Sequence, residues 1–242
     1  MRPFLFFLTV LAGLHFQDAP ARLYEQTYSI YIHGALAGTE SVSERRDKDG
    51  NRVCSSQHEM LVTDSLETKR MAFETTMIFV KDTTVPLSYS LKYLSGSKDF
   101  CNVTVTNGKI SRMLSRGGNP SEATAALQPA AIILDVNVYY QYDIFSRVYD
   151  FKKRGRQTFN NFLPVIGSFV PVAVTWLEDS KLDYGKSTIA VRNFKIDFFE
   201  SKTGYFSTDT SGRLVRLIIH DQDLEVVRKD LVPQAQEIIK KH

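Results

Sequence analysis

Apolar and polar residues alternate along almost the whole chain of 242 residues, and this period of two limits the fold to extended strands. The clearest run has an apolar residue at every second position: Val85, Leu87, Tyr89, Leu91 and Tyr93. Successive side chains of a strand point to opposite faces, so the pattern predicts strands with one buried face. Turn dipeptides such as Asp49-Gly50 and Asn107-Gly108 separate the runs, as in hairpins. The sequence therefore predicts a mainly β protein of about 10 to 11 antiparallel strands.

One segment after the middle of the chain has helical spacing instead. Asp135 is the expected N-cap of a helix with one apolar stripe, formed by Val138, Tyr142, Phe145 and Tyr149. A short helical piece is also expected within Ala123–Ala131. We expect an antiparallel curved sheet or half-barrel, with the helix inserted against its concave face.

Near the C-terminal end, one strand changes the face on which its apolar residues lie, and this change predicts a bend in the sheet. In the run 186–199, the apolar positions shift from Ile189 and Val191 to Phe194 and Ile196. A strand with period two changes face through a bulge, which also bends it. The sequence therefore predicts a bulge near Arg192-Asn193.

The hairpin around Asn107-Gly108 predicts a pairing register and places one arginine on an apolar face. A two-residue turn pairs Thr106 with Lys109, and therefore Val103 with Arg112. A buried arginine needs a carboxylate, water or an anionic ligand. Alternatively, Arg112 lies at the rim of the sheet and its side chain reaches solvent. The sequence leaves both interpretations open.

The first 21 residues have the pattern of a cleavable export signal. Arg2 precedes the apolar run Phe4–Leu14, and Ala19-Pro20-Ala21 supplies the small residues of a cleavage site. We expect cleavage after Ala21, a single β half-barrel domain over residues 22–233, and a polar C-terminal tail over 234–242. The apolar run is shorter than the roughly 20 residues that span a membrane. The expected location is therefore the periplasm or the outside of the cell, with no membrane span.

The chain has two cysteines, Cys54 and Cys101. In an oxidising compartment these residues are expected to form a disulfide. The alternative is a pair of buried free thiols, because the sequence does not give the distance between them.

Charge and motifs argue against several function classes. A formal net charge of +3 is too small to indicate nucleic-acid binding. His58-Glu59 begins a zinc-protease signature, but Val62 stands where the second histidine is required. We therefore expect no metal site, no cofactor and no catalytic residue, and an enzyme is not the expected function.

The C-terminal part of the chain resembles a family of bacterial exported proteins of unknown function. The resemblance rests on Tyr205–Leu217, with Asp209 and Gly212-Arg213-Leu214, and on the strand pattern of 223–228. Residues 140–142, 157–159 and 163–164 are similar to the family's middle part, so the likeness covers about the last 110 residues. It implies that a strand, an Asp-x-x-Gly-Arg-Leu turn and a final strand complete a curved sheet. The family in turn resembles the half-barrel of periplasmic lipoprotein carriers, which hold acyl chains between sheet and helices.

These expectations lead to three functional hypotheses. The first is an exported protein that binds a lipid, acyl chain or other apolar ligand between sheet and helix, through Arg112, Tyr142, Phe145, Tyr149, Tyr89, Leu91 and Tyr93. The aromatic residues among these are equally compatible with an ordinary core. The second is an assembly or interaction module of the cell envelope with a filled core and a protein partner. The third is a hydrolase whose carboxylates are brought together by folding.

Overall fold

The computed structural model describes residues 22–64, 67–94, 98–135, 137–184, 187–198 and 202–231. The expected signal peptide and the expected polar tail lie outside these residues.

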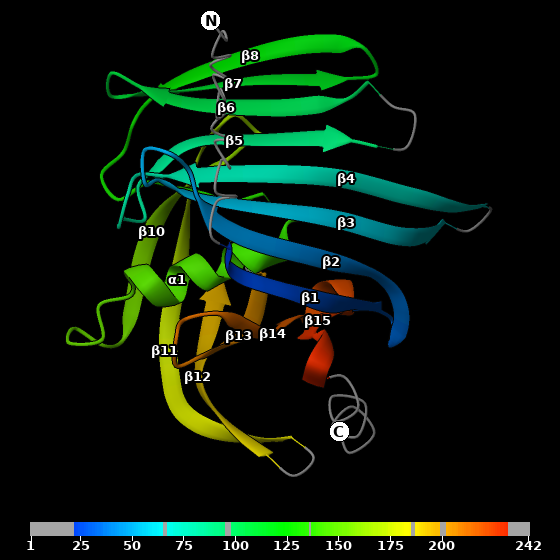
Figure 1. Cartoon of the computed structure of the whole chain (residues 1–242), viewed down its shortest axis with the longest axis vertical. Helices are drawn as coiled ribbons and strands as arrows, with labels where there is room; N and C mark the ends of the chain where they lie inside the picture. Colours follow the sequence, from blue (N-terminus) through cyan, green and yellow to red (C-terminus); the bar gives the residue numbers. More distant parts are fainter. Residues whose placement is uncertain are drawn as a thin grey trace, which may run out of the picture.

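The described residues form one sheet of fifteen strands (Figure 1). The first eight strands are β1 (Arg22–Ile32), β2 (Ala35–Arg46), β3 (Arg52–Asp64), β4 (Glu67–Phe79), β5 (Pro86–Tyr93), β6 (Phe100–Thr106), β7 (Lys109–Arg116) and β8 (Asn119–Ala126). The remaining strands are β9 (Ile132–Ile133), β10 (Arg156–Leu163), β11 (Ser168–Tyr184), β12 (Ser187–Asp197), β13 (Thr203–Asp209), β14 (Leu214–Ile219) and β15 (Leu224–Arg228). The mainly β prediction is confirmed, although the sheet has more strands than expected.

The order of strands places both ends of the described chain in the middle of the sheet. It runs β8-β7-β6-β5-β4-β3-β2-β1-β15-β14-β13-β12-β11-β10-β9, so β1 pairs with β15. Neighbours are antiparallel except β9 and β10, which are parallel and make the sheet mixed. The two edge strands, β8 and β9, follow each other in the sequence.

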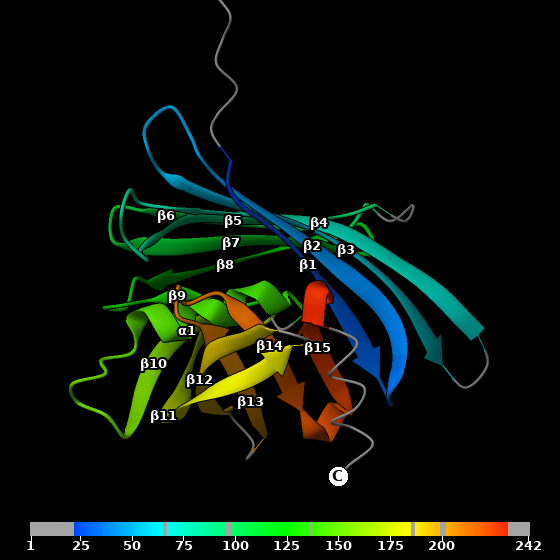
Figure 2. The same ribbon diagram turned by 60° about the horizontal axis from the view of Figure 1, so that its bottom comes forward.

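The sheet curls until its two ends approach each other without closing. Figure 2 shows β9 and α1 between the part formed by β2 to β8 and the part formed by β10 to β15. At the seam, the turn after β10 reaches β8, where a Cβ placed on Gly167 would lie 2.7 Å from the Cβ of Ala123. The predicted curved sheet is therefore present as an open barrel.

The predicted bulge at Arg192-Asn193 is wrong. The register shift lies in the neighbouring strand β11, where Trp176 pairs with Phe194, Glu178 pairs with Asn193, and Leu177 is the extra residue. Strand β12 changes its apolar parity without a bulge because opposite faces are buried along its length. Val191 packs in a small separate cluster with Val215, whereas Phe194 belongs to the main core.

The helical segment is shorter than predicted. Tyr139–Tyr142 forms the 3-10 helix η1 and Asp143–Val148 forms α1, whose N-cap is Tyr142 and not Asp135. Asp135 does not cap α1, because it lies well before Asp143, where that helix begins; its carboxylate accepts hydrogen bonds from the Tyr89 hydroxyl at 2.9 Å and the Asn137 backbone N–H at 3.3 Å. The stripe is nevertheless buried as predicted, including Val138. The second helical piece expected within Ala123–Ala131 is wrong, because Asn119–Ala126 forms the edge strand β8.

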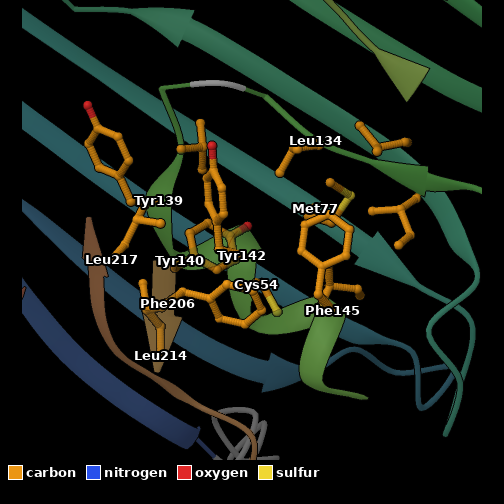
Figure 3. Close-up of a cluster of buried hydrophobic side chains, with 14 of the residues drawn as sticks. Cys54, Met77, Leu134, Tyr139, Tyr140, Tyr142, Phe145, Phe206, Leu214 and Leu217 are labelled. Carbon is orange, nitrogen blue, oxygen red and sulfur yellow. The ribbon is translucent and has the colours of Figure 1, made fainter. Parts of the chain in front are cut away.

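The interior of the barrel is filled by this segment and by the inward side chains of the strands. Figure 3 shows Tyr139, Tyr140, Tyr142 and Phe145 among residues of β3, β4, β13 and β14. Phe145 is fully buried and its ring lies 6.2 Å from that of Phe206. The core therefore lies where a half-barrel carrier would hold its guest.

Glu40 and His58 fasten η1 to the sheet. Both side chains are fully buried on the paired strands β2 and β3, with Glu40 Oε1 2.7 Å from His58 Nε2. This contact is close but not aligned for a hydrogen bond. The other oxygen, Oε2, accepts the backbone N–H of Tyr140 at 3.0 Å. His58, the first residue of the incomplete zinc-protease signature, therefore has a packing role. Its ring stacks on that of Phe73, with centroids 4.3 Å apart.

Candidate functional site

The turn between β13 and β14 carries one arginine to the open end of the barrel beside α1. Asp209 Oδ1 accepts the backbone N–H groups of Ser211 and Arg213, each at 3.0 Å. Gly212 has a φ of +79°, which a glycine adopts without steric penalty. Its carbonyl accepts a hydrogen bond from Ser146 Oγ on α1 at 3.2 Å. The Asp-x-x-Gly-Arg-Leu turn is therefore a structural device that positions Arg213.

Arg213 binds Glu44 of β2, which β1 and β15 separate from β14 in the sheet. Its two terminal nitrogens lie 2.5 and 3.1 Å from the Glu44 carboxylate oxygens, and its guanidinium lies 4.1 Å from the centre of the Tyr24 ring. Burial acts to raise the pKa of Glu44, but the hydrogen bonds and charge of Arg213 outweigh it. The pKa of Glu44 therefore lies below its ordinary value.

Two further arginines, Arg52 and Arg147, lie beside this pair. Arg147 donates a hydrogen bond to Asp143 Oδ2 at 2.7 Å within α1. Burial raises the pKa of Asp143, and the nearby guanidinium groups of Arg147 and Arg213 oppose this rise. Arg52 approaches Glu44 Oε2 only to 3.8 Å, and its guanidinium lies 4.2 Å from the centre of the Phe79 ring.

The space around these charges consists of a small internal void and an open cleft. The void lies between α1 and the sheet and has a volume of about 20 Å³, which accommodates about one water molecule. The open cleft has a volume of about 530 Å³ and is lined by the end of β2, the start of β3, the turn after β4 and Arg147 of α1. Glu44, Arg52 and Arg147 border both spaces. A ligand of more than a few atoms therefore fits the open cleft and not the space beneath the helix.

The residues expected to line a cleft from the helix belong to the packed core. Tyr142, Phe145 and Tyr149 are buried, and their rings contact other aromatic rings. The nearest neighbours of Tyr149 include Phe194, with ring centroids 5.8 Å apart. The Tyr149 hydroxyl donates a hydrogen bond to the Gly155 carbonyl at 2.6 Å. These side chains are therefore packed against neighbouring aromatic rings.

The residues expected to line a cleft from the sheet are divided between the core and its margin. Tyr89 and Leu91 are buried, and the Tyr89 hydroxyl donates a hydrogen bond to the Asp135 carboxylate. Burial, and then the charge of Asp135, raises the pKa of Tyr89 well above its ordinary value. Tyr93 is half-buried with its ring 5.7 Å from that of Phe73. Leu91 and Tyr93 also border an open surface cleft of about 540 Å³ over β4, β5 and β6, and Tyr89 is not part of its lining.

Arg112 is buried on the inner face, as the hairpin register predicts. Val103 pairs with Arg112 and the side chain is only 7% exposed. Its terminal nitrogen donates to Ser121 Oγ at 3.1 Å, and its buried Nε has no hydrogen-bond partner among the residues that the structure describes. A Cβ on Gly167 would lie 2.9 Å from the guanidinium, so the arginine fills the seam of the barrel. The interpretation that Arg112 reaches solvent at the rim is wrong, and its role as a ligand anchor stays a prediction.

The expected disulfide is wrong, because Cys54 and Cys101 are buried free thiols. Cys54 lies on β3 and Cys101 on β6, with β4 and β5 between them. Three strand spacings separate the two residues by about 14 Å, more than twice the usual Cα separation of a disulfide. Burial raises the pKa of each thiol to about 12.

Reasoning from the sequence missed most of the charged cluster. Glu44, Arg52 and Arg147 were not recognised, and Arg213 was assigned only to the turn motif. A usable signal was present in β2, where Glu40 and Glu44 share their parity with the apolar Val42. Carboxylates at inward positions require cationic or hydrogen-bonding partners, which the sequence does not locate.

Within the described parts of the chain, no helix combines the length and the apolar character needed to cross a membrane. The same residues contain no group of three or more His, Cys, Asp or Glu side chains arranged to hold a metal ion.

The fold and the site together define an open, β-barrel-like protein with a filled interior and a cluster of arginines and carboxylates beside α1. Among solved structures, the chain is similar to a β-barrel-like protein from Brucella abortus, a domain of unknown function named DUF1849. The likeness has a TM-score of 0.56 at 9% identity and covers 85% of this chain and 94% of that one. At this identity it shows the fold alone. No family model and no curated protein matches the sequence.

Proposed function

We propose that this chain is an exported interaction module of the cell envelope that acts through its outer surface and carries no guest in its interior. The observation that carries the proposal is the void of about 20 Å³ beneath the helical segment. Pockets that hold small molecules have volumes of roughly 300 to 1,000 Å³. An acyl chain therefore has no room between α1 and the sheet without displacing Tyr142 or Phe145.

The exposed edge of the sheet is the surface best suited to a partner chain. The edge strand β9 is buried at both its residues, whereas most residues of the other edge strand, β8, are exposed. An unpaired strand edge offers backbone N–H and C=O groups to an additional strand. We infer that the partner supplies an extended segment that pairs with β8.

The hydrolase hypothesis receives less support. Glu44 and Asp143 both border the small void, as that hypothesis requires. Each carboxylate, however, is hydrogen-bonded to an arginine, at 2.5 Å from Arg213 and 2.7 Å from Arg147. A void that accommodates one water molecule also leaves no room for a substrate.

Photocrosslinking in intact host cells tests the partner. A photoreactive residue at Thr124 of β8 is expected to give one dominant protein adduct, and the same residue at Ser41 of the central strand β2 is the control. Both positions are exposed. Equal adducts from the two positions, or none from Thr124, would contradict pairing at the edge.

Native mass spectrometry and cell fractionation test the rest of the proposal. The protein purified from its own envelope is expected to begin at Arg22, to contain no copurified lipid, and to take up no fluorescent fatty acid. A stoichiometric acyl ligand would restore the carrier hypothesis. Unprocessed protein in the cytoplasm would refute export.

A further inference from the structure

The open cleft beside α1 is lined largely by charged side chains and is here named the arginine cleft. Its volume is about 530 Å³, and the residues that matter most are Glu44, Arg46, Arg52, Asp82, Thr84 and Arg147. The size falls within the range of small-ligand sites.

Arginines outnumber the carboxylates that neutralise them in this region. Arg213 forms an ion pair with Glu44, and Arg147 forms an ion pair with Asp143. At the rim of the cleft, Arg46 pairs with Asp82 at 2.7 Å.

Among the described residues of this cleft, Arg52 is the arginine that shares its carboxylate with another arginine. It approaches Glu44 Oε2 at 3.8 Å, and Arg213 holds the same oxygen at 2.5 Å. The Arg52 side chain is only 12% exposed. A guanidinium withdrawn this far from water is stabilised by a partner that brings negative charge.

The cleft also contains hydrogen-bond donors that the protein does not use. A guanidinium has five N–H donors, and Arg52 forms no hydrogen bond with the described residues. The Phe79 ring, 4.2 Å away, supports the plane of that guanidinium. Within the described part of the chain, the buried Nε of Arg147 has no hydrogen-bond partner.

We propose that the arginine cleft binds an oxyanion of the phosphate class between Arg52 and Arg147. The planar fork of an arginine matches the oxygens of a phosphate, and a doubly charged ligand neutralises the excess charge at Arg52. Thr84, whose side chain has a hydroxyl group, also lines the cleft. The phosphate group belongs either to a free anion or to a phospholipid headgroup. This inference goes beyond the proposed function and is independent of pairing at β8.

Two binding measurements on the purified protein test the site and identify the source of the anion. Inorganic phosphate is titrated calorimetrically at constant ionic strength, with chloride as the reference. In parallel, the protein is sedimented with phosphatidylcholine vesicles that either contain or lack phosphatidylglycerol. Saturable phosphate binding assigns a free anion, and binding only to the anionic vesicles assigns a headgroup. Absence of binding in both measurements overturns the proposal.

Three variants locate the binding in the cleft. Arg52→Gln is expected to weaken binding at least about tenfold, because it removes charge-assisted hydrogen bonds. Asp82→Asn is expected to strengthen binding about twofold to fivefold, because it removes a rim carboxylate and releases Arg46. Arg70→Gln is the control, since Arg70 is an exposed arginine paired with Glu59 on strands β3 and β4.

Misfolding cannot explain a higher affinity of Asp82→Asn for the anion. This variant therefore still tests the site if Arg52→Gln is unstable. The proposal is overturned if Arg52→Gln binds as tightly as Arg70→Gln, or if Asp82→Asn weakens binding.

Discussion

Arg213 and Glu44, which are 169 residues apart in the sequence, form a two-pronged ion pair with N···O distances of 2.5 and 3.1 Å. The pair joins the turn before β14 to β2, past the two strands β1 and β15 that lie between them in the sheet. Because Glu44 is only 5% exposed, the loss of one partner leaves a charge with little access to water. This pair therefore makes a measurable contribution to the stability of the fold.

Glu44→Gln is expected to lower the free energy of unfolding by about 3 kcal/mol, the usual cost of breaking a buried ion pair. The control is Glu59→Gln on the adjacent strand, where the exposed pair with Arg70 contributes about 0.5 kcal/mol or less. Urea denaturation followed by circular dichroism measures both changes. Equal losses in the two variants would show that the Glu44 pair has no special role.

The contribution of Glu44 is also expected to depend on pH. Its pKa is lowered in the folded state, so its stabilising effect is complete above the unfolded value of about 4.3 and is lost as the pH falls through the folded value. The stability difference between wild type and Glu44→Gln should therefore shrink as the pH is lowered from about 6 to about 3. Denaturation curves at several pH values measure this difference, and a constant difference would contradict the prediction.

Asp135 is expected to show the opposite dependence. Burial raises its pKa, and the hydrogen bonds from Tyr89 and the Asn137 backbone only partly offset this effect. Its contribution to stability is complete below the unfolded pKa of about 3.9 and is lost as the pH rises through the raised folded value. Asp135→Asn removes this titration, so the variant should gain stability relative to wild type as the pH rises from about 4. If Asp135→Asn instead lost stability relative to wild type as the pH rises, the raised pKa of Asp135 would be contradicted.

Cys54 and Cys101 are expected to resist alkylation in the folded protein. Both are buried, and a thiol whose pKa is raised to about 12 contains little thiolate at about pH 8. Iodoacetamide should modify neither residue until a denaturant is added, and both afterwards, as judged by intact mass. A mass two daltons lower without reductant would instead indicate a disulfide.

Gly38→Ala is expected to destabilise the protein by about 3 kcal/mol or more, because it places a methyl group against the backbone of a paired strand. The new Cβ would collide with the Glu59 carbonyl oxygen and would lie 2.7 Å from the Met60 Cα. Gly108→Ala is the control, since its Cβ would meet nothing within 4 Å and only the positive φ of +71° opposes it. Thermal denaturation compares the two variants, and a similar small loss in both would refute the close approach.

The sequence predicted local structure well where turn chemistry and period two agree. The pairing of Thr106 with Lys109 and of Val103 with Arg112 is confirmed, because a two-residue turn at Asn107-Gly108 allows only one register. Strand β8 was missed because its residues are mostly exposed, and an edge strand with little burial leaves no apolar alternation.

Features that depend on distant partners could not be predicted. Asp135 has the residue type of an N-cap, yet its carboxylate is engaged by Tyr89, 46 residues away in the sequence. The two cysteines share the inner face of the sheet but lie on β3 and β6, a separation fixed only by the strand order. The charged cluster was missed for the same reason, since Glu44 and Arg213 come together only when the sheet curls.

The pairing of β1 with β15 has a consequence for synthesis. A ribosome delivers the chain from its N-terminus, so β15, which completes the centre of the sheet, is made after the other fourteen described strands. Until residues 224–228 emerge, β1 and β14 each lack a neighbour, and both are open to pairing with other chains. A nascent molecule of this architecture is thus incomplete at its middle, where a chaperone that shields exposed strands would be needed longest.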